Sequence, residues 1–248
     1  MKTITNYRAT VLKKTRLYLY GVVMTLGLST APFILPAQTK APLPAVGTQA
    51  ILGNIDGINI EVAVQSPSAE NTPLQIACVF EYNDNDIFAP PALPQEANGM
   101  VHLDKGLNGI ITGLRKSGKF TGQAFETLLI DVPNGTIAPQ KLLLVGLGDR
   151  RKFDAEMMKT VGAIGMREAL RLGVDSYAHA SDLKDGGVDS PTGLVATNVL
   201  KGAIDAYRTQ VYLKSKQMSN FKPIKKITLL AGQPFYQITG DALKKAID

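Results

Sequence analysis

The turn GLGDRR at residues 146–151 contains the residue types that a phosphate-binding loop uses. Its glycines could bring backbone N–H groups close to an anion, and its arginines could pair with phosphate. However, a dinucleotide fingerprint needs a third glycine where Arg151 stands, and Asp149 places a negative charge where pyrophosphate would sit. We therefore favour a tight strand-to-helix turn. The residues kept as a candidate ligand loop are Gly146, Gly148, Arg150 and Arg151.

A second group of residues could hold a divalent metal through carboxylate and imidazole ligands. Its members are Asp175, His179, Asp182, Asp185 and Asp189. Their spacing does not match a calcium loop. Asp182, Asp185 and Asp189 fall in the Gly-rich stretch SDLKDGGVDSP, which predicts a solvated polar turn. We therefore predict no metal ligand and no cofactor-binding residue in this region.

Nucleophilic chemistry has few candidates in this chain. Cys78 is the only cysteine, and it lies in the apolar stretch LQIACVFEY, which predicts a buried strand residue without an activating partner. The only histidines are His102 and His179, and no G-x-S-x-G elbow occurs. Lys116 and Lys119 are expected in a solvated loop. No catalytic residue is predicted.

Periodicity indicates which elements would position these residues. Strands are expected at 58–64, 73–82, 125–133, 141–147, 174–180 and 225–232, and helices at 102–118, 154–173, 192–215 and from 241 onward. Asp154 is a suitable N-cap for the second helix, and Gly162 and Gly165 would allow that helix to approach a sheet closely. Strands alternate with helices, so we predict a three-layer α/β/α fold with a mixed, mostly parallel sheet.

The positive charge of the chain is concentrated at its start. The formal net charge is +6, but five basic residues lie within residues 1–37 and the first acidic residue is Asp56. Residues 38–248 hold 22 basic and 21 acidic side chains. This near-neutral body lacks the basic face that nucleic-acid binding requires, so no nucleic-acid partner is expected.

The N-terminal segment has the order of a secretory signal peptide. A basic, acid-free start is followed by an uncharged apolar run from Leu17 and by the small residue Ala37. We predict a signal peptide at 1–37, a flexible leader at 38–57, and an exported, periplasmic or secreted protein. The alternatives are an uncleaved anchor, because Leu17–Ala37 is long enough to span a bilayer, and an organelle transit peptide. Contact with a membrane is expected only if the segment stays uncleaved.

Four segments, taken in order, resemble a known family. They are a helix followed by Gly118, Phe120 and Gly122; a strand ending in Val145–Gly148; Tyr207-Arg208; and Tyr212–Lys216. Over residues 58–248 the chain resembles the N-terminal domain of the leucyl aminopeptidases, also called cytosol aminopeptidases. The resemblance implies a macro-domain-like fold. It also implies that catalysis belongs to a separate domain, which holds two divalent metals through Lys, Asp and Glu ligands and includes an Asn-Thr-Asp-Ala-Glu-Gly-Arg motif.

None of those catalytic motifs occurs here, so the resemblance transfers no catalytic or metal residue. We therefore expect a stand-alone, non-catalytic domain that acts by protein contact, either with a metalloaminopeptidase catalytic chain or with itself. One alternative is a small-ligand or nucleotide-binding module, although the Asn-rich and phosphate loops of nucleotide-binding macro domains are absent. Another is that the chain is a fragment of a split two-metal aminopeptidase.

Overall fold

The computed structural model describes residues 42–248, which form one compact unit; the predicted signal peptide and the first residues of the leader lie outside the described residues. A seven-stranded sheet has the order β1-β2-β7-β6-β3-β5-β4. The strands are β1 Gln49–Ile55, β2 Ile58–Val64, β3 Gln75–Val79, β4 Thr127–Asp131, β5 Lys141–Gly146, β6 Ser176–Ala180 and β7 Lys226–Ala231. The helices are α1 Gly99–Gly106, α2 Ile110–Lys116, α3 Met157–Leu172, α4 Thr192–Ser215 and α5 Tyr236–Ile247.

The five inner strands run parallel and the two edge strands run antiparallel. β2, β7, β6, β3 and β5 pair parallel in that order, while β1 pairs with β2 and β4 pairs with β5 in the antiparallel sense. The carboxyl ends of the parallel strands therefore share one edge of the sheet. Open α/β sheets bind ligands in crevices outside this edge.

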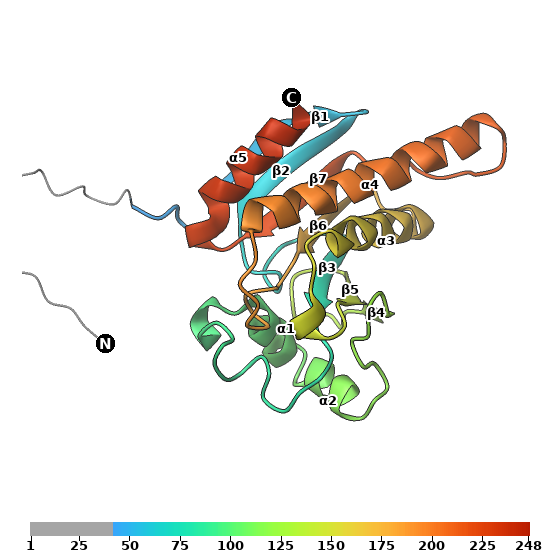
Figure 1. Ribbon diagram of the computed structural model, residues 1–248. Helices are drawn as coiled ribbons and strands as arrows, with labels where there is room; N and C mark the ends of the chain where they lie inside the picture. The colour runs from blue at the N-terminus through green and yellow to red at the C-terminus, as the bar shows by residue number, and fades with distance from the viewer. Residues whose placement is uncertain (1–41) are drawn as a thin grey trace, which may run out of the picture. The chain divides into compact units, whose positions relative to one another are not determined.

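Helices cover both faces of the sheet, which gives the three layers seen in Figure 1. Helices α3, α4 and α5 share one apolar core with side chains such as Ile60, Ile76 and Leu229. Helices α1 and α2 pack on the opposite face over a second core that includes Val79 and Leu144. The predicted fold class, three-layer α/β/α with a mixed, mostly parallel sheet, is confirmed.

Glycines set the spacing between α3 and α4. A Cβ atom on Gly162 would lie 2.0 Å from the Val199 carbonyl oxygen, and one on Gly202 would lie 1.8 Å from the Lys159 carbonyl oxygen. Real Cβ atoms do not approach oxygens this closely, so each glycine is needed for the helix contact. The expectation that Gly162 faces the sheet is wrong, because it faces α4; Gly165 does contact the sheet, at Ile76.

Three other expectations need correction. Residues 49–55 form edge strand β1, so the flexible leader predicted over 38–57 ends earlier than expected. The predicted helix at 102–118 is two helices, because Asn108 and Gly109 have φ angles of 57° and 78° and interrupt it. Helix α3 begins at Met157 and not at Asp154, although the Asp154 carboxylate accepts the Glu156 N–H in the turn before it.

Helices that could cross a bilayer are not found between residues 42 and 248, since none there is both long and apolar enough.

Candidate functional site

The candidate ligand loop is filled by the chain itself. A Cβ atom on Gly146 would lie 2.0 Å from the Gln123 carbonyl oxygen. Gly148 has a φ of 74°, and its N–H donates to the Gly122 carbonyl oxygen at 2.9 Å. The two glycines therefore make room for the segment that contains Gly122 and Gln123, and the turn is a packing feature as the sequence favoured.

An internal carboxylate occupies the anion-binding amides beside this turn. Glu126 Oε2 accepts hydrogen bonds from the backbone N–H groups of Thr121, Gly122 and Gln123 at 3.0, 2.8 and 3.1 Å, and from Thr121 Oγ1 at 2.7 Å. Partial burial opposes ionisation, but these hydrogen bonds prevail and lower the pKa of Glu126. The donors that could have held a phosphate are thus already used.

The arginines of the loop are also neutralised within the chain. Arg150 Nη2 lies 2.8 Å from Asp86 Oδ2, and the same carboxylate accepts from the buried Arg115. Arg151 donates to Asp149, and this hydrogen bond lowers the pKa of Asp149 to about 2. Arg150 and Arg151 border a hollow of about 550 Å³, but each guanidinium there already has a carboxylate partner.

The five residues considered for a metal site divide in the structure: His179, Asp182 and Asp185 line one cavity, whereas Asp175 and Asp189 do not. Asp175 pairs with Lys222, and Asp189 pairs with Lys184. Over residues 42–248, no group of three or more His, Cys, Asp or Glu side chains is arranged to hold a metal ion. The expectation of a solvated turn is wrong for Asp182 and Asp185, because both line a cavity and Asp185 is only 7% exposed.

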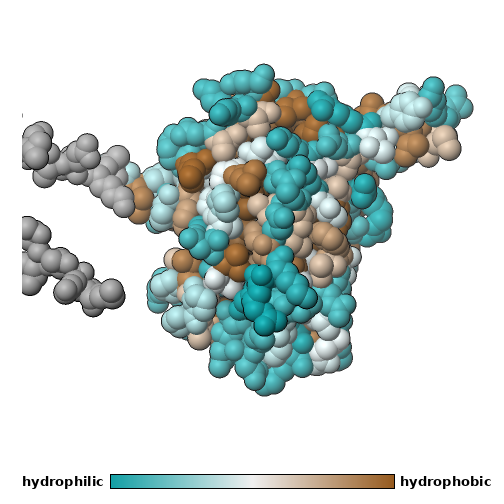
Figure 2. All heavy atoms as spheres, in the orientation of Figure 1, coloured by the Kyte–Doolittle hydropathy of each residue, from teal (hydrophilic) through white to brown (hydrophobic). Residues whose placement is uncertain are grey.

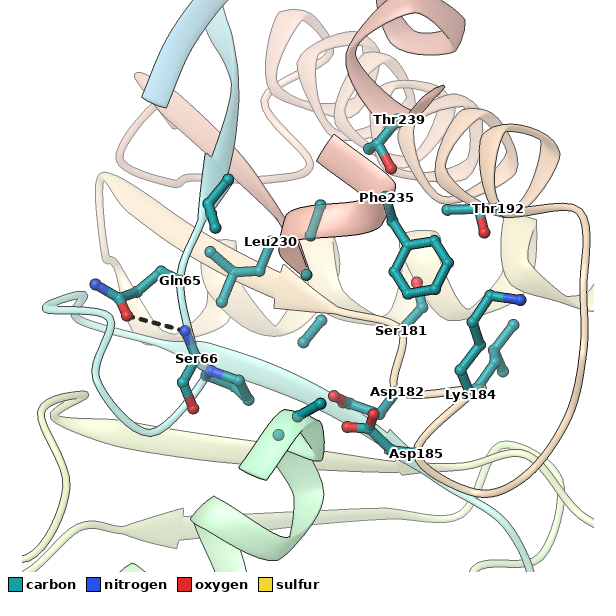
Figure 3. Close-up of a pocket in the computed structure, with 18 of the residues that line it drawn as sticks. Gln65, Ser66, Ser181, Asp182, Lys184, Asp185, Thr192, Leu230, Phe235 and Thr239 are labelled. Atoms are coloured by element: carbon teal, nitrogen blue, oxygen red, sulfur yellow. Dashed lines mark hydrogen bonds between the residues drawn. The ribbon is translucent and has the colours of Figure 1, made fainter. Parts of the chain in front are cut away.

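This cavity lies at the carboxyl edge of the sheet, where β2, β7 and β6 end. Its volume is about 410 Å³. Residues after β2, β6 and β7 form its walls, together with the first turns of α1 and α4. Figure 3 shows Gln65 and Ser66 on one side, Phe235 and Thr192 on the other, and Asp182 with Asp185 between them and α1. The position follows from the topology, since the parallel strands all end at this edge.

Backbone amides hold the two carboxyl groups in place. Asp182 Oδ2 accepts the Cys78 N–H at 3.1 Å, and Asp182 has a left-handed φ of 51°. Asp185 Oδ2 accepts the Met100 N–H at 3.0 Å, in the first turn of α1. Asn98 fixes the same loop by donating to the Asp185 carbonyl oxygen at 3.1 Å.

Burial and mutual repulsion control the ionisation of this pair. Burial first, and then the negative charge of Asp185, raise the pKa of Asp182 well above its usual range. Burial also raises the pKa of Asp185, although the amides of Met100 and Gly99 act in the opposite direction. The pair therefore retains a proton at pH values where an exposed aspartate has lost it.

His179 and Cys78 lie side by side, and His179 borders the cavity. Cys78 Sγ is 3.9 Å from His179 Nε2, a proximity that the sequence pattern did not show. Burial lowers the pKa of His179 to about 4, while burial and the charge of Asp182 raise the pKa of the Cys78 thiol. Both groups are therefore neutral at pH 7, and the pair lacks the thiolate that nucleophilic catalysis needs.

Comparison with known proteins places the chain within one family. The family described as "Cytosol aminopeptidase family, N-terminal domain" matches residues 87–216. A probable cytosol aminopeptidase of Roseiflexus castenholzii is 29% identical over 129 residues, 52% of this chain and 26% of that protein. One of Nitrosococcus oceani is 26% identical over 176 residues, 71% of this chain and 32% of that protein. The chain thus spans about a quarter to a third of the length of these relatives.

Two solved structures share the fold. A mutant of tomato leucine aminopeptidase superposes with a TM-score of 0.51 and 16% identity, over 82% of this chain and 36% of that chain. The macrodomain of Oceanobacillus iheyensis, in a structure with ADP, superposes with a TM-score of 0.51 and 14% identity, over 81% of this chain and 97% of that chain. The predicted macro-domain-like fold is confirmed, and the chain belongs to the cytosol aminopeptidase family, to whose N-terminal domain it corresponds.

Proposed function

We propose that this chain is a non-catalytic domain of the cytosol aminopeptidase type that acts by protein contact. One observation carries the proposal: the last third of α4 and the loop after it extend beyond the sheet (Figure 1). We call this segment, residues 208–223, the arm. Not one of its residues is buried, whereas ten residues of α4 before the arm are buried.

The arm exposes apolar side chains that a solvated helix end would not need. Val211, Tyr212 and Met218 are 45%, 62% and 74% exposed, and Figure 2 shows hydrophobic residues on the projecting segment. Isolated helical turns are marginal in water because most helical stability comes from packing. A projecting helix end with an apolar surface therefore indicates a contact site.

Charge favours an acidic partner surface. The arm contains Arg208, Lys214, Lys216 and Lys222 and no acidic residue. Arg208 pairs with Asp56 and Lys222 with Asp175, so the charge offered to a partner is that of Lys214 and Lys216. Two arms would repel one another, so the charges oppose arm-to-arm self-association. We assign the contact to the catalytic chain of a cytosol aminopeptidase, because the family match runs to residue 216 and includes the helical part of the arm.

The test is binding between the purified protein and an aminopeptidase catalytic chain from the same organism, measured by calorimetry. Tyr212→Ser and Met218→Ser should each weaken the complex at least about tenfold. Ile110→Ser is the matched control, since Ile110 is an exposed apolar residue on α2, outside the arm. The proposal fails if no complex forms, or if the control weakens binding as much as the arm variants.

We also propose that the chain is exported, on the basis of the basic, apolar and small-residue order of residues 1–37. Cell fractionation should recover the protein outside the cytoplasm, and its intact mass should match a chain that begins near residue 38. A cytoplasmic protein that retains residues 1–37 would contradict export. A retained segment in the membrane fraction would instead support an anchor.

A nucleotide-binding function has less support. The macrodomain structure with ADP shares the fold at only 14% identity, and the donors around Gly146–Gly148 are occupied by Gly122 and Glu126. The split-enzyme alternative has its own test, because a reading frame with the two-metal motif directly downstream in the DNA would support it. The arm would then contact a catalytic domain encoded beside it.

A further inference from the structure

We propose that the cavity at the carboxyl edge of β2, β7 and β6 binds a small organic cation, a primary amine with an apolar body. This site is separate from the arm and does not depend on the contact proposed above. It is defined by a facing carboxyl pair, an unpartnered histidine nitrogen and an apolar wall.

The carboxyl pair supplies the charge that an ammonium group needs. Figure 3 shows the carboxyl groups of Asp182 and Asp185 close together at the cavity. Both are held by backbone amides, Asp182 by Cys78 and Asp185 by Met100, so neither can turn away without losing a hydrogen bond. An ammonium group beside the pair would displace the proton that the pair retains, releasing it to solvent, and bind the ionised carboxyl groups; this attraction would be large because the site is largely removed from water.

Among residues 42–248, no cationic side chain forms an ion pair with Asp182 or Asp185. Lys184 Nζ is bound to Asp189 Oδ1 at 2.5 Å and lies 5.1 Å from the centre of the Phe235 ring. His102 Nδ1 is 3.1 Å from Ser66 Oγ, and the charge of His102 acts to lower the pKa of Asp185 without forming an ion pair with it. Glu96 is exposed at the cavity and adds a further negative charge.

His179 is the second, independent feature that points to a ligand. It lines the cavity and is 1% exposed, yet its Nδ1 has no hydrogen-bond partner within residues 42–248. The ring is neutral at pH 7, so one of its nitrogens carries no proton. With the proton on Nε2, which faces Cys78 Sγ, Nδ1 keeps a lone pair that has no donor among residues 42–248.

The walls select an apolar body for this ligand. Leu230, Val195 and Phe235 contribute apolar surface, and 410 Å³ falls in the range of cavities that hold small organic molecules. A bare metal ion would leave these walls uncovered. An anion such as a nucleotide diphosphate would face the carboxyl pair, and like charges at this distance oppose binding.

A matched series of probes tests the proposal on the purified protein. n-Hexylamine, 1-hexanol and hexanoate share one apolar chain and differ in charge. Calorimetry at pH 7.5 should show that hexylamine binds at least about tenfold more tightly than hexanol, with hexanoate the weakest. The proposal is overturned if hexanol binds as tightly as hexylamine. It is also overturned if the folded protein gives no heat with millimolar hexylamine, or binds ADP but not hexylamine.

Variants separate the site from the rest of the surface. Asp182→Asn and Asp185→Asn keep an oxygen for the backbone amide but remove the charge, and each should weaken hexylamine binding about tenfold or more. Asp205→Asn, at an exposed position on α4, is the control and should bind normally. If a variant has a lower unfolding midpoint, the ratio of hexylamine affinity to hexanol affinity still tests the proposal. Destabilisation weakens the binding of both probes, whereas loss of the carboxylate charge changes the ratio between them. Ser181→Leu should block all three probes, and unchanged binding would place them elsewhere.

Discussion

Replacement of Asp86 by asparagine should destabilise the protein through its two arginine partners. Asp86 accepts from Arg115 Nη1 at 3.1 Å, from Arg115 Nη2 at 2.5 Å and from Arg150 Nη2 at 2.8 Å. The Arg115 side chain is fully buried and the Asp86 side chain is 3% exposed. The substitution removes the only carboxylate bound to Arg115 among residues 42–248.

The size of the effect follows from burial. Two unit charges about 4 Å apart interact by about 4 kcal/mol at an effective dielectric constant of about 20. Removal of one partner from a buried pair costs about 3–5 kcal/mol. Asparagine keeps one acceptor oxygen, so we expect Asp86→Asn to lower the free energy of unfolding by about 3 kcal/mol. For a domain of this size, that corresponds to a decrease in Tm of about 6–12 °C.

Urea denaturation followed by circular dichroism measures this change. The control is Asp131→Asn on β4, since the Asp131 side chain is 82% exposed and pairs with Lys141 at the surface. Exposed pairs contribute about 1 kcal/mol or less. The structural role assigned to the arginine partners of Asp86 is refuted if Asp86→Asn lowers the free energy of unfolding by less than about 1 kcal/mol. It is also refuted if Asp86→Asn and Asp131→Asn lower that free energy equally.

Two further predictions concern stability. Gly202→Ala should lower the free energy of unfolding by about 1–3 kcal/mol, because its Cβ would lie 1.8 Å from the Lys159 carbonyl oxygen. Gly113→Ala on α2 is the control: its Cβ would meet no atom within 4 Å, so the same urea titration should show a neutral or stabilising effect. Burial lowers the pKa of His179 from 6.5 to about 4. At pH values between 4 and 6.5 the unfolded chain therefore binds a proton on His179 that the folded chain does not bind. The contribution of His179 to stability should therefore fall as the pH decreases from 6.5 to 4, by up to about 3 kcal/mol, whereas the raised pKa values of Asp182 and Asp185 act in the opposite direction. His179→Gln should remove the His179 contribution to the pH dependence. If His179→Gln leaves the pH dependence of stability unchanged, the assignment of that dependence to His179 is contradicted. If Gly202→Ala leaves the free energy of unfolding unchanged, the packing role of Gly202 is contradicted.

Local patterns predicted most of the fold. Ile58–Val64 alternates apolar residues and forms β2 with the expected bounds, and the apolar stripe of 192–215 forms α4 with the expected bounds. Strand β1 was missed because an edge strand is only half-buried and lacks a strong apolar pattern. The break at Asn108 was missed because the apolar spacing continues across it, whereas the left-handed φ values depend on local geometry.

The site was less predictable because its residues meet only through tertiary structure. Asp182 and Asp185 lie in a sequence that is typical of a solvated turn, and their burial depends on contacts with Cys78 and Met100, each more than 80 positions away. The glycine loop could be judged from sequence, since Arg151 and Asp149 depart from a phosphate loop. The carboxylate that fills the neighbouring amides, Glu126, gave no signal in the sequence.

Hydrogen exchange of the arm, with and without the aminopeptidase catalytic chain, tests the central proposal most directly. Residues 208–215 end a helix but bury no side chain, so their amides should exchange much faster than those of α4 before residue 208 in the protein alone. Binding of the catalytic chain should slow exchange in residues 208–223 and leave α2 unchanged. A complex that forms without any protection of the arm would contradict the account.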